Sequence, residues 1–219
     1  MPLGLMGDSR PMTLYALKPR FQGLLRPLVA RLAAAGVTAN QVTVAAVVGS
    51  VVVAAIVISA AGYRAVFLLL PLWLLVRMAL NAIDGMLARE FAQQSRLGAY
   101  LNEICDVVSD AALMLPFAVV PPFTPALVVI VVVLAGLAEF AGALGPMVGA
   151  ARRYDGPAGK SDRALAFGAL GVWLGLAGPL PGWAAWAMPL IALLLVITIV
   201  NRVRGGLAEA EARHASTTP

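Results

Sequence analysis

Charged residues are scarce in this sequence. Only 12% of the 219 residues are Asp, Glu, Lys or Arg, whereas 61% are hydrophobic and the mean hydropathy is +0.88. A soluble domain of this length cannot bury so much apolar surface, which excludes an ordinary soluble protein. The composition therefore predicts an integral membrane protein.

Cysteine and histidine are nearly missing. The single cysteine, Cys105, excludes an internal disulfide, and we interpret it as a small packing residue. The single histidine, His214, is assigned no role. A zinc site would need Cys and His ligands that this chain does not offer, so any metal must be held by oxygen atoms.

The first 37 residues hold no apolar core of the signal-peptide type, so we expect the N-terminus to be retained. Within them, residues 14–36 alternate basic and apolar positions at near-helical spacing. This pattern is typical of an amphipathic helix that lies in the membrane interface, with a solvated helix as the alternative.

The long apolar runs that follow predict six transmembrane helices. These lie near residues 41–61, 64–84, 98–120, 126–150, 164–180 and 183–203. The fold class is therefore all-α, a polytopic membrane protein in three parts. These parts are an N-terminal segment with an interfacial helix (1–36), a six-helix transmembrane domain (37–204) and a polar C-terminal tail (205–219), which we expect to be frayed.

The basic residues indicate how the chain lies in its membrane. The net charge of +5 clusters beside apolar segments, which favours anionic lipid over nucleic acid as the partner. Apart from Arg64, the loop clusters fall on one side, which predicts a plasma or inner membrane protein with both termini and the active site cytoplasmic. Arg77 alone lies deep within a predicted span.

Polar residues interrupt the apolar pattern between positions 81 and 110. Ionisable groups cost several kcal/mol in hydrocarbon unless they face a cavity or a partner, so they mark a working site. Helical spacing places Asn81 and Asp84 on one face of one helix, and Asn102, Asp106 and Asp110 on one face of the next. The short linker makes the two helices antiparallel neighbours.

Converging carboxylate and amide oxygens are hard ligands, suited to Mg²⁺ or Mn²⁺. Gly85 and Gly98 lie beside the two oxygen clusters and would let a bulky ligand approach the backbone. In the alternative interpretation, the Asn and Asp residues only join helices by hydrogen bonds.

The spacing resembles the signature of the CDP-alcohol phosphatidyltransferase family, Asp-x2-Asp-Gly-x2-Ala-Arg-x8-Gly-x3-Asp-x3-Asp. In this sequence the positions read Asn81, Asp84, Gly85, Ala88, Arg89, Gly98, Asn102 and Asp106. The spacing matches throughout, although two of the four aspartates are asparagines. GVTANQVT (36–43) is similar to the family's entry to its first span, and residues 138–140 with 159–160 are similar to its fourth-to-fifth-span region.

The resemblance implies a metal-dependent phosphotransferase of phospholipid synthesis. An alcohol attacks the β-phosphorus of a CDP-linked lipid donor and CMP leaves. On this basis Asp106 is the catalytic base, and Gly85, Ala88, Arg89 and Gly98 face the nucleotide. The metal ligands are Asn81, Asp84, Asn102 and Asp106, with Asp110 as a further candidate. The resemblance also implies a homodimer.

The two asparagines leave the number of ions open, because the motif supplies two negative charges where the family has four. We hypothesise that Asp110, Glu103 or both restore the missing charge, or that the site holds one ion.

A basic loop on the same predicted side carries Arg152, Arg153, Lys160 and Arg163. These residues could hold an acceptor phosphate or a lipid headgroup phosphate, or reflect only the positive-inside topology. Glu139 either pairs with a basic group or faces the cavity. The acceptor alcohol stays open. A catalytically silent relative that binds nucleotide or lipid is the second functional hypothesis, and a small transporter is the third.

Overall fold

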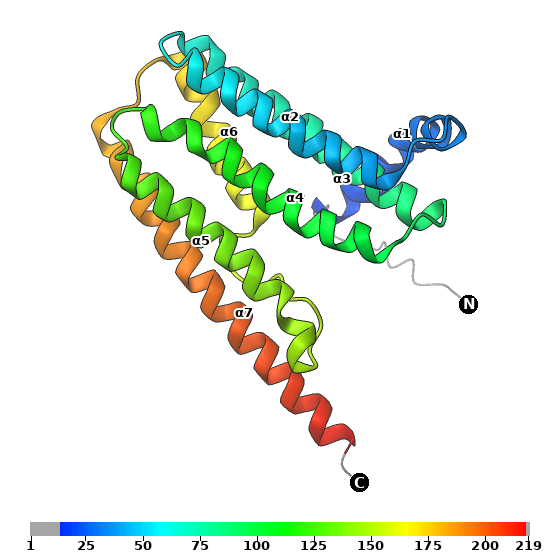
Figure 1. Cartoon of the computed structure of the whole chain (residues 1–219). Coiled ribbons are helices and arrows are strands. Elements are labelled where there is room, and N and C mark those ends of the chain that lie inside the picture. Colours follow the sequence, from blue (N-terminus) through cyan, green and yellow to red (C-terminus); the bar gives the residue numbers. More distant parts are fainter. Residues whose placement is uncertain (1–13, 218–219) are drawn as a thin grey trace, which may run out of the picture.

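The computed structural model describes residues 14–217, which form helices joined by short turns (Figure 1). The α-helices are α1 (Leu14–Ala34), α2 (Ala39–Ser59), α3 (Leu69–Glu90), α4 (Arg96–Met114), α5 (Pro125–Ala143), α6 (Lys160–Val172) and α7 (Ala187–Thr217). Short 3₁₀ helices precede or follow them at Arg64–Leu68, Leu115–Val119, Gly145–Val148 and Gly182–Trp186, and a π-helical turn at Trp173–Ala177 extends α6. The prediction of an all-α protein is confirmed for the described residues.

Each of the six predicted spans coincides with helix, but not all of them qualify as spans on their own. Four helical stretches are long and apolar enough to cross a bilayer: Ala39–Ser59, Arg64–Glu90, Pro125–Ala143 and Gly182–Ala215. By contrast, α4 carries four charged residues, and α6 has 13 residues. The structure therefore supports an integral membrane protein with four candidate spans, and the count of six stays a prediction.

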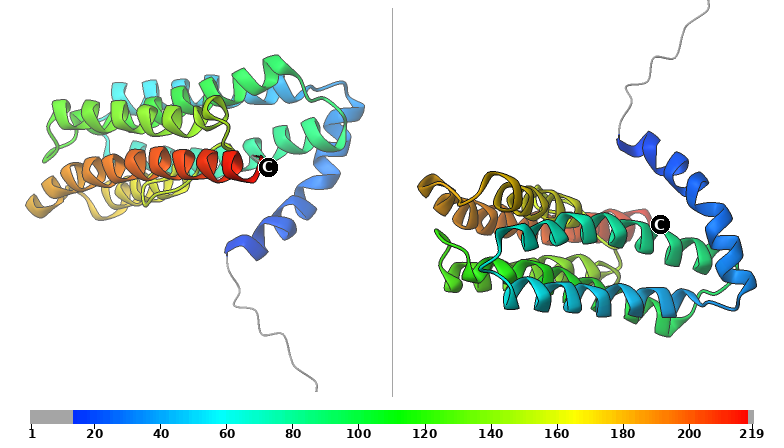
Figure 2. Two further views of the ribbon diagram at one scale, coloured as in Figure 1. Left: turned by 90° about the horizontal axis from the view of Figure 1, so that it is seen from below. Right: turned by 90° about the horizontal axis from the view of Figure 1, so that it is seen from above.

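Helices α2 to α7 run alternately up and down in one bundle, with α2 packed against both α3 and α4, and α5 against α7 (Figure 1). The turn between α3 and α4 and the loop over residues 149–159 lie at the same end, which we call the polar end. Helix α1 packs against α3 and crosses this end at an angle to the bundle (Figure 2). The predicted N-terminal helix exists, while its place in the membrane interface remains a prediction.

Local sequence explains how the helices begin at the polar end. Gly36 ends α1 with a φ of 78°, a conformation that glycine adopts without strain. Thr38 and Gln41 then form a capping box, in which each side chain accepts a hydrogen bond from the other residue's backbone N–H. Ser95 caps α4 by accepting a hydrogen bond from the backbone N–H of Gly98. These caps fix the two helix starts that border the site.

Aromatic packing fills the bundle away from the polar end. The Phe117 ring is fully buried and meets the rings of Phe167, Phe67 and Phe123 at centroid distances of 5.2, 5.9 and 6.4 Å. Such tilted and edge-to-face pairs each contribute about 0.5–1.5 kcal/mol beyond the area they bury. This apolar core leaves the charged side chains to the opposite part of the bundle.

The loop over residues 149–159 is fastened to α7. Thr198 accepts a hydrogen bond from the backbone N–H of Ala158 at 3.0 Å, and Gly156, with a φ of 117°, lies so close to Thr198 that a Cβ atom would be 2.6 Å from its Cα. Asp155 pairs with Arg153 at 2.7 Å, and this guanidinium holds the pKa of the carboxyl below its usual value. The loop is thus a fixed wall of the polar end.

The prediction that the tail is frayed is wrong for residues 205–217, because α7 continues through them. Glu209 accepts hydrogen bonds from Arg153 and from the backbone N–H of Ala151, and pairs with Arg213 one helical turn further on. These contacts give the polar extension partners that its sequence alone did not indicate.

Candidate functional site

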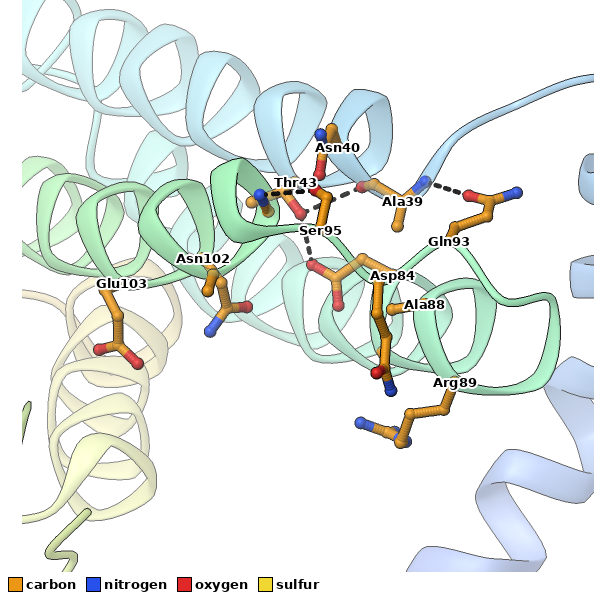
Figure 3. A pocket seen from close by; sticks show the side chains of 14 residues that line it. Ala39, Asn40, Thr43, Asp84, Ala88, Arg89, Gln93, Ser95, Asn102 and Glu103 are labelled. Carbon is orange, nitrogen blue, oxygen red and sulfur yellow. Dashed lines mark hydrogen bonds between the residues drawn. The ribbon is translucent and has the colours of Figure 1, made fainter. Parts of the chain in front are cut away.

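A first cavity of about 480 Å³ opens at the polar end between the start of α2, the end of α3 and the start of α4 (Figure 3). Its walls include Asn40 and Thr43 from α2, Asp84, Gly85, Ala88 and Arg89 from α3, Gln93 and Gln94 from the turn, and Gly98, Asn102 and Glu103 from α4. Six residues that the motif assigned to nucleotide or metal binding therefore share one cavity.

Asp84 is the buried acid of this cavity, with 6% of its surface exposed. Its carboxylate accepts a hydrogen bond from the Thr43 hydroxyl at 2.8 Å, and Figure 3 shows it between the ends of α2 and α3. The other buried acids of the described chain, Asp110 and Glu139, have arginine partners, whereas Asp84 has no ion-pair partner among the described residues. A buried carboxylate of this kind favours a cation as ligand.

Close approach of backbone and side chains explains the two motif glycines. A Cβ atom at Gly98 would lie 2.8 Å from Oδ1 of Asn40, and one at Gly85 would lie 2.8 Å from the Arg89 guanidinium. Any larger residue at these positions would therefore displace groups that line the cavity. That Gly85 and Gly98 leave room for a ligand stays a prediction.

A second cavity of about 410 Å³ lies beside the first, between α4, α5, the loop over residues 149–159, α6 and α7. Asn102 and Glu103 line both cavities, so one turn of α4 separates them. Asp106 faces the second cavity, where its carboxylate pairs with Lys160 at 2.6 Å and with Arg77 at 3.2 Å. Asp84 and Asp106 thus face adjoining spaces and do not turn to opposite sides of the bundle.

Asp110 does not lie free beside Asp106. Both of its carboxylate oxygens are bound to buried guanidiniums, one to Arg77 and the other to Arg163 at 2.6 Å. Arg77 contacts Asp106 and Asp110 together, so it joins α3 to two successive turns of α4. The sequence predicts that Asp110 supplies negative charge to a metal ion. In the structure its carboxylate already neutralises two arginine side chains.

The sequence leaves two alternatives for Glu139, pairing with a basic group or facing the cavity, and the structure shows both. It lines the second cavity, and it pairs with Arg152, Arg163 and Arg202. Arg152 also pairs with Glu103, which was the other candidate for restoring charge to the motif. This acid is therefore also matched by an arginine. Asp106 is paired as well, with Lys160 and Arg77, so among these carboxylates Asp84 alone has no ion-pair partner in the described part of the chain.

The basic loop residues are all paired, but they do not all face one space. Arg152 and Lys160 line the second cavity, and Arg163 forms its buried support. Arg153 instead reaches towards α7, where it pairs with Asp155 and Glu209. Of the four residues predicted to bind phosphate, Arg152 and Lys160 line the second cavity, and Arg153 and Arg163 do not.

Asn81 faces a third, mainly apolar cavity of about 600 Å³ between α3 and α6, where Lys160 and Ser161 also contribute. It lies one helical turn from Asp84 but borders a different space. Lys160 lines both this cavity and the second one, so the polar ends of the two spaces meet there.

Sequence reasoning missed some residues that shape the site. Thr43 was part of the GVTANQVT segment, and its spacing from the capped helix start could have placed it on the face that contacts Asp84. Arg77 was noted only as a charge deep in a span, yet it binds both Asp106 and Asp110. Tyr154, whose ring lies 4.9 Å from the Arg152 guanidinium, and Arg202 carried no signal in the sequence.

Three of the predicted metal ligands offer oxygen atoms to the two adjoining cavities. Asp84, Asp106 and the amide of Asn102 offer oxygen ligands around the shared turn of α4, and Asp84 is a buried charge that lacks a counter-ion. Among the described residues there is no group of three or more Asp, Glu, His and Cys placed to hold a metal.

The fold and the cavities define a helical membrane protein with an oxygen-lined site at one end of its bundle. Residues 36–200 match the CDP-alcohol phosphatidyltransferase family. The chain is 46% identical to the inner membrane protein YnbA of Escherichia coli over 199 residues, which cover 90% of this chain and 97% of that protein. The chain belongs to the CDP-alcohol phosphatidyltransferase family.

Solved structures show the same fold. The phosphatidylinositol phosphate synthase PgsA1 of Mycobacterium tuberculosis, with CDP-DAG bound, is 24% identical and superposes with a TM-score of 0.68, covering 82% of this chain and 92% of that one. Its complex with manganese and citrate gives the same identity and TM-score, with 83% and 88% covered.

Proposed function

We propose that this protein is an inner-membrane phosphotransferase that moves a phosphatidyl or related phosphoalcohol group from a CDP-activated donor to an alcohol, with release of CMP. The observation that carries the proposal is the placement of Asp84 and Asp106 in adjoining cavities separated by one turn of α4. Family membership supports the reaction class, and the CDP-DAG bound to a structural relative supports the donor.

In this proposal the donor occupies the first cavity. Gly85 and Gly98 let the nucleotide approach the backbone, and the Arg89 guanidinium, which folds over Gly85, lies close enough to bind its phosphates. The diphosphate then points towards Asp84 and Asn102. The alcohol enters from the second cavity, so its hydroxyl reaches the β-phosphorus from the side opposite the departing CMP.

Asp106 is the proposed general base. Its carboxylate accepts the proton of the alcohol as the new phosphate ester bond forms and the bond to CMP breaks. Lys160 and Arg77 pair with the Asp106 carboxylate and fix its orientation. Asp84, Asp106 and Asn102 would hold a divalent ion, which would neutralise the diphosphate, whereas Asn81 borders the third cavity. We propose Asp110 as the counter-ion of Arg77 and Arg163, not as a ligand.

We further propose that all six helices α2–α7 cross the membrane, with both termini and the site on the cytoplasmic side, and that the protein is a homodimer. The alternating direction of the helices and the cluster of basic residues at the polar end support this topology. The location of the E. coli relative supports the inner membrane.

The test is CMP release by the purified protein with CDP-diacylglycerol, Mg²⁺ or Mn²⁺ and a panel of alcohols. Asp106→Asn should lower the rate about 10²–10⁴-fold, because it removes the base but keeps the shape. Glu211→Gln changes an exposed acid of α7 outside the cavities and should match the wild type. Metal-dependent donor binding without CMP release from any alcohol would instead favour a catalytically silent family member.

A further inference from the structure

The second cavity combines many charges with no excess of positive charge. Among the described residues, five carboxylates line it, those of Glu103, Asp106, Asp110, Glu139 and Asp162, against the three basic groups of Arg152, Lys160 and Arg202. Arg77 and Arg163 lie behind the wall and pair with the same acids, which brings the balance to zero.

The basic side chains of the cavity already pair with acids, although Nε of Arg152 has no hydrogen-bond partner among the described residues. Arg152 binds Glu103 and Glu139, and Lys160 binds Asp106. Arg202 forms an ion pair with Glu139 and donates hydrogen bonds to the backbone carbonyls of Ala138 and Asp155. A phosphate monoester needs several donors free of other anions, and here it would have to displace carboxylates from buried arginines.

A neutral hydroxyl group interacts with this cavity in a different way from a phosphate group. Each hydroxyl donates one hydrogen bond and accepts others, so it fits between a carboxylate and a neighbouring guanidinium without breaking the pair. Tyr154, which is exposed and lies against the Arg152 guanidinium, adds a flat apolar surface beside these polar groups. Carboxylates, guanidiniums and one aromatic ring together match the mixed surface of a polyol.

We infer that the acceptor of this protein is a neutral polyol and not a phosphorylated one. The inference rests on the proposed function, because it assigns the second cavity to the acceptor. A divalent ion between the cavities does not change the charge argument, since the two negative charges of the donor diphosphate match it. The sequence predicts Arg152, Lys160 and Arg163 as phosphate ligands. In this inference they are hydrogen-bond donors whose positions are fixed by the acids that pair with them.

The first experiment measures phosphate binding without any donor. The thermal midpoint of the purified full-length protein in detergent is followed with inorganic phosphate or glycerol 3-phosphate, against sodium chloride of equal ionic strength. We expect no saturable increase for the wild type. A saturable increase that Arg152→Gln abolishes would overturn the inference, whether or not the protein proves to be a transferase.

A matched pair of variants tests the cause. Glu103→Gln removes one acid at the rim, one of the two that pair with Arg152, so glycerol 3-phosphate should now bind at least about tenfold more tightly than to the wild type. Glu211→Gln removes an acid of the same charge outside the cavity and should bind no more tightly. If Glu103→Gln gains nothing over Glu211→Gln, charge balance is not what excludes phosphate and the inference fails.

The second experiment measures CMP release from CDP-diacylglycerol with glycerol or inositol against glycerol 3-phosphate. The neutral alcohols should react at least about tenfold faster. Faster release with the phosphorylated alcohol overturns the inference while leaving the proposed function intact. Release with no alcohol counts against the proposed function, and the binding experiment then still decides whether the cavity accepts a phosphate.

Discussion

Asp84 and Asp110 are two buried acids at the same end of one bundle, but their surroundings differ. Asp84 has a single hydroxyl partner, Thr43, and borders the first cavity, whereas Asp110 neutralises two buried arginines behind the second. A buried charge that lacks a partner in the folded chain is available to a ligand, and one that is fully paired stabilises the fold. On this comparison we propose Asp84 as a functional acid and Asp110 as a structural one.

The largest effect on stability should come from removing the paired acid. Asp110→Asn leaves Arg77 and Arg163 without their shared counter-ion, so we expect the free energy of unfolding to fall by about 3–5 kcal/mol. Asp84→Asn makes the same chemical change where no cation is lost, and should leave stability unchanged or raise it. Denaturant unfolding of both variants measures the difference, and equal losses would remove the distinction drawn between the two acids.

Metal binding should distinguish the same two positions with a somewhat smaller effect. Mg²⁺ or Mn²⁺ at about 100 times its dissociation constant should stabilise the wild type by about 2.7 kcal/mol, because the ion binds only the folded chain. Asp84→Asn should lose this stabilisation, and Asp110→Asn should keep it on its lower baseline. Thermal unfolding with metal and with chelator provides the measurement. Loss of the metal effect in Asp110→Asn alone would restore Asp110 as a ligand.

The smallest effect is expected for an ion pair in neither cavity. Arg26 of α1 and Glu90 of α3 form an exposed pair at 3.0 Å, and water screens pairs of this kind. Arg26→Gln should therefore leave the thermal midpoint and CMP release unchanged within error. A double-mutant cycle with Glu90→Gln measures the coupling, and a large coupling would mean that α1 docking depends on this pair.

Much of this site follows from helical periodicity. The spacing of Asp84, Gly85, Ala88 and Arg89 assigns them to one end of a helix, and the short linker brings Gly98 and Asn102 beside them, as the first cavity confirms. The prediction of six helical segments also follows, because long apolar runs bounded by Gly and Pro leave few other choices in a membrane.

The pairing of charges could not be predicted in this way. Asp110 binds Arg77 and Arg163, which lie 33 and 53 residues away in the sequence. Which arginine reaches which acid depends on how α3, α4 and α6 pack, and periodicity fixes only the face on which each residue lies. The same limit applies to Asn81, which lies one helical turn from Asp84 but lines a different cavity.

The single turn of α4 between the two cavities has a kinetic consequence. Asn102 and Glu103 line both cavities, so under the proposed function each substrate would have its own route to the phosphorus centre. Neither has to leave before the other arrives, so a ternary complex in which both are present, and not a phosphorylated enzyme that waits between two half-reactions, is the arrangement that this architecture allows most simply.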